Sequence, residues 1–115
     1  MNTSYYASPK ILKRDFKLIS ISRKPPDWFK VDNIFLPLCP TWDLVMSYNS
    51  RKITKEEYTI RYYMENLDLL DPAKTYQALG ENSVLLCYEK SGVFCHRRIV
   101  AKWLMDNLNI NITEL

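Results

Sequence analysis

The stretch SVLLCYEKSGVFCHRRIVAKWLMDNL, residues 83–108, carries the clearest structural pattern of this 115-residue chain. Residues 83–88 form an apolar run, which is typical of a strand buried on both faces of a sheet. After a short polar loop, apolar side chains recur at helical spacing over about 94–108. A buried strand that leads through a short loop into an amphipathic helix indicates a parallel α/β sheet.

The remaining chain supplies further elements of the same kind. Residues 2–7 and 16–22 predict two more strands, and the second ends where Pro25 and Pro26 remove amide donors. Helices are expected at 41–47, at 54–70 and within 71–80. We therefore predict a single α/β domain over residues 1–115, with a small, mostly parallel sheet of three to four strands flanked by helices.

The helix expected at 54–70 begins with a capping box made by Thr54 and Glu57. Its apolar residues at helical spacing predict one buried stripe, made of Ile60, Tyr63, Met64, Leu67 and Leu70. Tyr58 and Tyr62 are four residues apart and lie off this stripe. They either line a pocket or cover the edge of the sheet.

Composition limits the classes of function. Apolar residues make up 47% of the chain without a run long enough to span a membrane, and no signal-peptide pattern opens it, so we expect a cytoplasmic protein without a membrane partner. A net charge of +3 is weak evidence for an anionic partner and gives little support to nucleic-acid binding. Three cysteines without CxxC spacing are expected to be thiols in a reducing compartment.

Reactive residue types gather where the motif strand meets the motif helix. Cys87 lies at the carboxyl end of the strand, and Cys95, His96 and Arg97 lie in the first turn of the helix. The first turn of a helix offers unpaired amides and the positive end of the dipole, which lower the pKa of a cysteine and favour anions. Arginine adds a planar fork suited to carboxylate or phosphate. The sequence therefore predicts an anion-binding pocket with Cys95 as its reactive thiol.

The carboxyl ends of the other predicted strands lie at the same edge of a parallel sheet. Ser4 and Tyr5 close the first strand, and Ser22 and Arg23 close the second. In open parallel sheets, ligands bind beyond the carboxyl ends of the strands. We therefore expect these four residues to contact the ligand together with Cys87 and Arg97, and we expect Arg23 and Arg97 to converge on one negative group.

Structural roles remain open for each of these residues. A cysteine on a buried strand such as Cys87 is commonly a small core residue, and an inward histidine such as His96 is commonly a hydrogen-bonded structural residue. Arg98 shares a helix face with Lys102 and is expected to be solvated. In this alternative, Cys87, His96 and Arg97 only hold the last helix to the sheet.

A metal site and a redox pair are the remaining alternatives for the cysteines. Cys39, Cys87, Cys95 and His96 would form a Cys₃His set suited to zinc, but the spacing lacks a short CxxC knuckle. Adjacent Cys95 and His96 are also expected to point in different directions on a helix. We therefore expect no metal and no cofactor. A transient disulfide between Cys87 and Cys95 is possible because the loop allows them to approach.

Several stretches together resemble one family. They are TSYYA at 3–7, ISISRKPPDWF at 19–29, LPLCPTWDLV at 36–45, the helix from Tyr58 to Tyr62, and LLCYEKSGVFCHRRIVAKWL at 85–104. This pattern resembles the domain-of-unknown-function family 488 (DUF488) over nearly the whole chain. The resemblance implies a small α/β domain and family motif positions at Ser4, Tyr5, Ser22, Arg23, Cys87, Glu89, Cys95, His96 and Arg97. Cys39 departs from the family pattern, which further weakens the zinc interpretation.

Two functions follow from these residues. In the first, the domain is an enzyme acting on a small anionic substrate, such as a nucleotide-like compound. Cys95 is then the nucleophile or anion contact, and His96 or Glu89 is the proton-transfer partner. In the second, the same pocket binds a ligand or a nucleic-acid end without chemistry.

Overall fold

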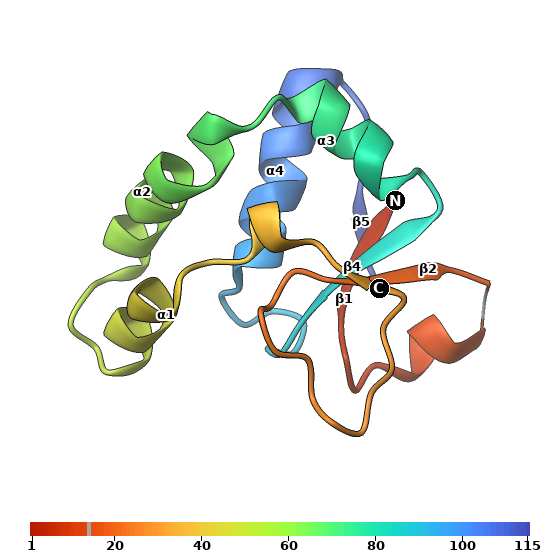
Figure 1. The fold of residues 1–115 in the computed structure, drawn as a ribbon, viewed down its shortest axis with the longest axis horizontal. Coiled ribbons are helices and arrows are strands. Elements are labelled where there is room, and N and C mark those ends of the chain that lie inside the picture. Colours follow the sequence, from red (N-terminus) through yellow and green to blue (C-terminus); the bar gives the residue numbers. More distant parts are fainter. Residues whose placement is uncertain (14) are drawn as a thin grey trace.

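Five parallel strands form one sheet in the computed structural model, which describes residues 1–13 and 15–115. The sheet has the order β3-β2-β4-β1-β5 (Figure 1). The strands are β1 (Asn2–Tyr5), β2 (Lys17–Ser20), β3 (Asn33–Ile34), β4 (Ser83–Cys87) and β5 (Thr113–Glu114). The predicted α/β class is confirmed. The strand count exceeds the expected three to four because β3 and β5 have only two residues each, too few to produce a recognisable pattern.

The central strand is β4, as its apolar sequence predicted. It pairs in parallel with β1 on one side and with β2 on the other, so that Leu86 lies between Ser4 and Ser20. All five residues of β4 are buried. The three strands predicted from sequence are therefore parallel neighbours, and their carboxyl ends meet at one edge of the sheet.

Four α-helices complete the fold: α1 (Trp42–Asn49), α2 (Lys55–Glu65), α3 (Pro72–Leu79) and α4 (His96–Leu108). The predicted caps are present. Thr54 and Glu57 form the capping box of α2, Asp71 caps α3, and Gly80 ends α3 with a φ of 88° that favours glycine. Short 3-10 helices cover Pro9–Lys13, Leu36–Leu38 and Leu67–Leu69.

The sheet has a hydrophobic core on each face. Ile19, Leu85 and Leu104 belong to the larger core, which the α-helices cover. Val84 and Leu86 point to the opposite face and pack with residues of the 3-10 helix Pro9–Lys13 and of the following loop. In Figure 1, α3 and α4 lie on one side of the sheet and the Pro9–Lys13 helix lies on the other. This alternation explains why successive residues Val84, Leu85 and Leu86 of β4 are all apolar.

The buried stripe predicted for the helix at 54–70 was wrong for Ile60 and Met64, whereas Leu67 is buried and Tyr63 and Leu70 pack against the core. Ile60 and Met64 are exposed by 61% and 65%, whereas Tyr58 and Tyr62 are buried. The Tyr62 hydroxyl donates a hydrogen bond of 2.7 Å to the Leu38 carbonyl, which allows a polar aromatic residue to occupy the core. The helix also ends at Glu65, so residues 67–70 follow in a different helical phase. The two buried side chains of α2 are therefore tyrosines, and not the apolar residues that the periodicity selected.

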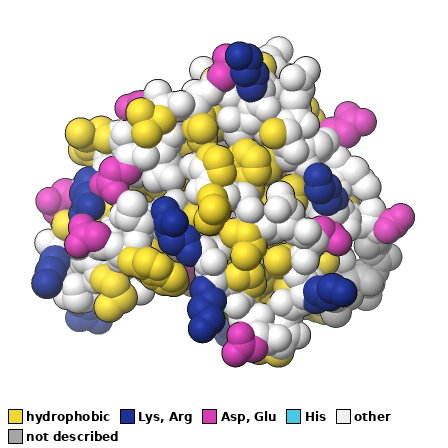
Figure 2. Space-filling view, in the orientation of Figure 1, with side chains coloured by type: hydrophobic (Ala, Val, Ile, Leu, Met, Phe, Trp, Pro, Cys, Tyr) yellow, Lys and Arg dark blue, Asp and Glu magenta, His cyan; other side chains and the backbone are white. Residues whose placement is uncertain are grey.

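Charged side chains of both signs are distributed over the surface. On the face shown in Figure 2, the basic and acidic groups of the described residues are interspersed, and apolar side chains gather near the middle. Such a mixture gives no clear electrostatic footprint for a nucleic-acid backbone. Among the described residues, no helix is both long enough and apolar enough to cross a membrane.

Candidate functional site

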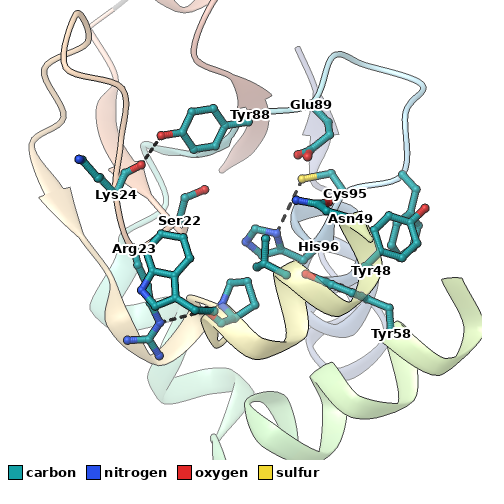
Figure 3. A pocket seen from close by; sticks show the side chains of 14 residues that line it. Ser22, Arg23, Lys24, Tyr48, Asn49, Tyr58, Tyr88, Glu89, Cys95 and His96 are labelled. Atoms are coloured by element: carbon teal, nitrogen blue, oxygen red, sulfur yellow. Dashed lines mark hydrogen bonds between the residues drawn. The ribbon is translucent and has the colours of Figure 1, made fainter. Parts of the chain in front are cut away.

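A cavity of about 380 Å³ opens beside the first turn of α4. Figure 3 shows side chains from α1, α2, the start of α4 and the loops after β2 and β4 around it. The cavity is therefore built at the carboxyl ends of two adjacent parallel strands, the place where open α/β sheets bind ligands. Its walls are formed by Ser22, Arg23, Lys24, Pro40, Trp42, Val45, Tyr48, Asn49, Tyr58, Tyr88, Glu89, Phe94, Cys95 and His96.

Five of the residues singled out in the sequence lie together in this cavity. Ser22 and Arg23 follow β2, Glu89 follows β4, and Cys95 and His96 begin α4. The Nε atom of Arg23 donates a hydrogen bond of 3.0 Å to the Pro40 carbonyl, which holds its exposed guanidinium at the cavity wall. Parallel pairing of β2 with β4 brings these segments together although they are far apart in sequence.

Four other predicted site residues do not line the cavity: Ser4, Tyr5, Cys87 and Arg97. Ser4 is fully buried, and its hydroxyl donates to the carbonyl of Leu115 beside β5. Tyr5 ends β1 and is half-buried. The expectation that Arg23 and Arg97 converge on one ligand was wrong, because the Arg97 guanidinium binds Glu114 of β5.

Cys95 and His96 are adjacent in sequence and also in space. The Sγ atom of Cys95 lies 3.8 Å from the Nδ1 atom of His96 (Figure 3). The expectation that the two side chains point in different directions was wrong. Cys95 is the N-cap of α4, with an extended backbone at φ −151° and ψ 143°, so helical spacing does not govern the direction of its side chain.

His96 is held as a neutral imidazole. Its Nε2 atom lies 2.7 Å from the carbonyl of Ile21 and must donate there, because a carbonyl oxygen only accepts. The Nδ1 atom therefore carries the lone pair that faces Cys95. Burial lowers the pKa of His96 to about 4, although the hydrogen bond to Ile21 acts in the opposite direction. Near neutral pH the ring carries no charge, and its Nδ1 atom is able to accept a hydrogen bond if Cys95 is reduced to a thiol.

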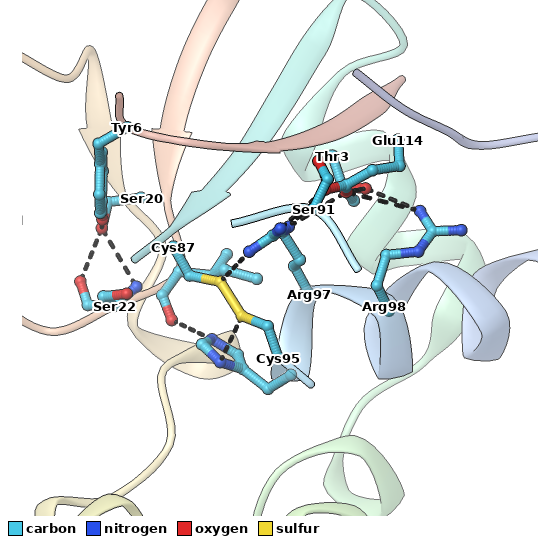
Figure 4. Close-up of a disulfide and its surroundings, with 12 residues drawn as sticks. Thr3, Tyr6, Ser20, Ser22, Cys87, Ser91, Cys95, Arg97, Arg98 and Glu114 are labelled. Atoms are coloured by element: carbon cyan, nitrogen blue, oxygen red, sulfur yellow. Dashed lines mark hydrogen bonds and ion pairs between the residues drawn. A yellow bond between two sulfur atoms is a disulfide. The ribbon is translucent and has the colours of Figure 1, made fainter. Parts of the chain in front are cut away.

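Cys87 and Cys95 form a disulfide in the structure (Figure 4), and Cys39 is a free, buried cysteine. The expectation of three thiols was wrong for this pair, and the alternative of a Cys87–Cys95 bond is the one that the structure shows. Burial raises the pKa of the Cys39 thiol to about 11. Cys39 is therefore a buried core thiol, and its Sγ atom donates to the Phe35 carbonyl.

The sulfur atoms of Cys87 and Cys95 and a ring nitrogen of His96 lie within 4.8 Å of one another. These three atoms would suit zinc if the disulfide were reduced. However, the Nη1 atom of Arg97 donates to the Cys87 sulfur at 2.9 Å, and a guanidinium in contact with a ligand atom opposes the binding of a metal cation there. Cys39, the fourth ligand considered from sequence, is not part of this group of side chains.

Arg97 lies at the centre of a buried ionic network between α4 and β5 (Figure 4). Its side chain is 1% exposed and donates through Nη2 to Glu114 at 2.7 Å. Thr3 and Ser91 also donate to this carboxylate, and Arg98 donates to Thr3 instead of being only solvated. Partial burial raises the pKa of Glu114, but the hydrogen bonds from Arg97, Thr3 and Ser91 outweigh it and hold the pKa at about 2.

Aromatic side chains form the wall that sequence reasoning largely missed. Tyr48 packs against Tyr58 and Phe94 with ring centroids 5.4 and 5.2 Å apart, and Trp42 and Tyr88 complete the aromatic lining. Pocket lining was left open for Tyr58, and it is confirmed. The signal for Trp42 and Tyr48 was weak because the aromatic segment at 31–52 shows no periodicity that would place their rings.

A model of the DUF488-N3a family, described as the active DUF488-N3 subclade, matches residues 2–108. No curated protein and no solved structure matches the chain. The match covers the three central strands, the cavity walls and the Cys-His-Arg motif. The chain therefore belongs to the DUF488 family, as the motif at 85–104 predicted.

Proposed function

We propose that the cavity beside α4 binds a small anionic ligand with a flat aromatic portion, such as a nucleotide, and that Cys95 reacts with it. The observation that carries this proposal is the 3.8 Å contact of Cys95 Sγ with His96 Nδ1 in the wall of a cavity that also contains Arg23. A thiol, a neutral imidazole and a guanidinium provide a nucleophile, a proton acceptor and an anion contact.

Recognition of the anion is assigned to Arg23 and to the start of α4. The Arg23 side chain is anchored through Nε to Pro40, so its fork is oriented before a ligand arrives. The first turn of α4 adds the positive end of a 13-residue helix on the same cavity wall. Arg97 has no part in ligand binding because Glu114 occupies its guanidinium.

Recognition of the flat portion is assigned to the aromatic wall. Tyr48, Tyr58 and Phe94 already pack as a tilted or edge-to-face cluster, and Trp42 is 56% exposed at the cavity. Aromatic faces bind flat rings by stacking with little conformational cost. A cavity of about 380 Å³ falls in the range of small-molecule sites.

Chemistry at this site requires the disulfide to be reduced, because Cys95 is a nucleophile only as a thiol or thiolate. The Cys95 thiol then donates to His96 Nδ1, whose orientation is fixed by the hydrogen bond to Ile21. Glu89 stands at the exposed rim of the cavity and exchanges protons with solvent and ligand. The description of the matching subclade as active is consistent with such chemistry.

Binding is tested with reduced protein by thermal shift, using AMP, adenosine and inorganic phosphate as probes. We expect AMP to raise Tm more than either adenosine or phosphate. Only AMP has both a phosphate for Arg23 and a flat base for the aromatic wall. Arg23→Gln should remove the advantage of AMP over adenosine. Lys74→Gln, which removes an exposed cation of α3 outside the cavity, should leave it unchanged.

The chemical role of Cys95 is tested by Cys95→Ser in the same assay. This variant should keep the response to AMP, while covalent capture of a reactive nucleotide analogue carrying a chloroacetyl group should be lost. The proposal is contradicted if AMP and phosphate leave Tm unchanged, or if Arg23→Gln and Lys74→Gln behave alike.

A further inference from the structure

The two sulfur atoms of the disulfide lie in different electrostatic surroundings. The Nη1 atom of Arg97 contacts the sulfur of Cys87 at 2.9 Å (Figure 4). The sulfur of Cys95 instead faces the uncharged ring of His96 (Figure 3). Arg97 is fully buried, so its field at Cys87 is weakly screened by water. The two cysteines are therefore not equivalent when the bond between them is reduced.

The charged side chains nearest to this part of α4 are Arg97, Arg98 and Glu114. Arg97 and Arg98 contribute two positive charges on α4, and Glu114 of β5 contributes one negative charge that it shares with both. His96 adds no charge near neutral pH. A thiolate at Cys87 would accept the hydrogen bond that Arg97 already directs at this sulfur.

Cys95 has no comparable partner. It is the N-cap of α4, but its side chain forms no capping hydrogen bond with the backbone. Its sulfur nevertheless lies in the cavity wall, whereas Cys87 does not line the cavity. A reagent that enters the cavity therefore meets Cys95 first, while Cys87 remains on the inner side, in contact with Arg97.

We propose that Cys87 and Cys95 form a redox-active pair in which a small thiol attacks Cys95 and Cys87 leaves as a thiolate held by Arg97. In the first step, the thiolate RS⁻ attacks Cys95 Sγ, the bond between the two cysteines breaks, and its electron pair goes to Cys87 Sγ. In the second step, another RS⁻ attacks the sulfur of the bound RS group. This step releases RSSR and the Cys95 thiolate, which takes a proton from water.

The pair therefore undergoes two-electron reduction while two molecules of the small thiol are oxidised to RSSR. Attack at Cys95 is favoured because the better-stabilised thiolate is the better leaving group. The proposal is independent of which ligand the cavity binds. It concerns the sulfur chemistry alone, so a failure of AMP binding would leave it standing.

The test measures thiolate absorbance at 240 nm between pH 5 and pH 9 in reduced protein that carries Cys39→Ser. With Cys95→Ser added, only Cys87 titrates, and with Cys87→Ser added, only Cys95 titrates. We expect the midpoint of Cys87 to lie at least about one pH unit below the midpoint of Cys95, because an adjacent arginine lowers the pKa of a thiol.

Three arginine variants separate the effect of the Arg97 contact from the effect of nearby positive charge. Arg97→Gln should raise the Cys87 midpoint, and Arg97→Lys should restore part of the shift. Arg98→Gln removes the same charge one residue away, without a contact to Cys87, and should move the midpoint less. The comparison of Cys87 with Cys95 does not need these variants, so it remains decisive if Arg97→Gln does not fold.

Reduction by glutathione provides the second measurement. Acid quenching followed by peptide mapping should find glutathione on Cys95 and a free thiol at Cys87. A Cys87 midpoint at or above that of Cys95, or glutathione on Cys87, would overturn the proposal.

Discussion

Glu114 of β5 and Arg97 of α4 form an ion pair, with 2.7 Å between Oε2 and Nη2. The guanidinium also donates through Nε to both carboxylate oxygens, at 3.1 and 3.2 Å. Among the residues whose burial is described, Arg97 is one of the largest fully buried side chains. This pair therefore joins an edge strand of two residues to the helix that carries the candidate site, and it keeps a buried positive charge compensated.

Glu114→Ala should destabilise the protein by about 2–3 kcal/mol, because it leaves the buried charge of Arg97 without its partner. The measurement is the free energy of unfolding from urea titration. Asp106→Ala breaks the exposed pair with Lys102 and serves as the control, with no measurable change expected. Equal effects of the two substitutions would show that the buried pair is not structurally important.

Lowering the pH should weaken the same ion pair between Glu114 and Arg97. The folded-state pKa of Glu114 lies at about 2, below its ordinary value of 4.5, so the stabilisation is complete above about pH 4.5 and is lost as pH falls towards 2. Glu114→Gln cannot titrate and should lose less stability than the wild type in this window. Unfolding monitored by circular dichroism at several pH values measures the difference, and parallel curves would contradict the assignment.

His96 should make stability depend on pH in a higher pH range than Glu114 does. Its folded-state pKa of about 4 lies below the ordinary 6.5, so the unfolded chain binds the proton more readily between these values. Stability should therefore fall as pH decreases from 6.5 to 4, by up to about 3 kcal/mol. His96→Gln keeps a donor for the Ile21 carbonyl and cannot titrate, so its loss in this window should be smaller. His96 is the only histidine, which makes the difference assignable.

The Tyr62 hydroxyl should contribute measurably to stability. Tyr62→Phe removes the buried hydrogen bond to the Leu38 carbonyl and should cost about 1–2 kcal/mol. Tyr63→Phe changes a partly buried side chain at the next position of α2 and is the matched control. If both variants unfold at the same urea concentration as the wild type, the hydrogen bond does not explain why a tyrosine occupies the core.

Alkylation of reduced protein should single out Cys95. It lines the cavity, whereas Cys39 is a buried thiol whose pKa is raised to about 11 and Cys87 lies behind the cavity wall. Limited labelling with iodoacetamide and peptide mapping should show Cys95 reacting more than about tenfold faster than Cys39. AMP should protect Cys95 and leave Cys39 unaffected. Labelling of Cys39 before Cys95 would contradict the site.

The parallel α/β fold could be predicted from sequence because its signals are local. The apolar run of β4, the capping box of α2 and the glycine after α3 each depend on neighbouring residues only. The carboxyl ends of parallel strands must then share an edge, and at this edge Ser22, Arg23, Glu89, Cys95 and His96 line one cavity.

The contacts of other residues depend on segments that are distant in sequence and meet only in the folded chain. Arg97 turns towards Glu114, 17 positions further along the chain, because β5 pairs beside β1, and a strand of two residues has no sequence pattern. Tyr58 and Tyr62 are buried because α2 packs that face against the core, where the Leu38 carbonyl satisfies one hydroxyl. Periodicity and capping are local properties that a sequence displays, whereas burial of a charge or a hydroxyl depends on a distant partner that only the folded chain brings near.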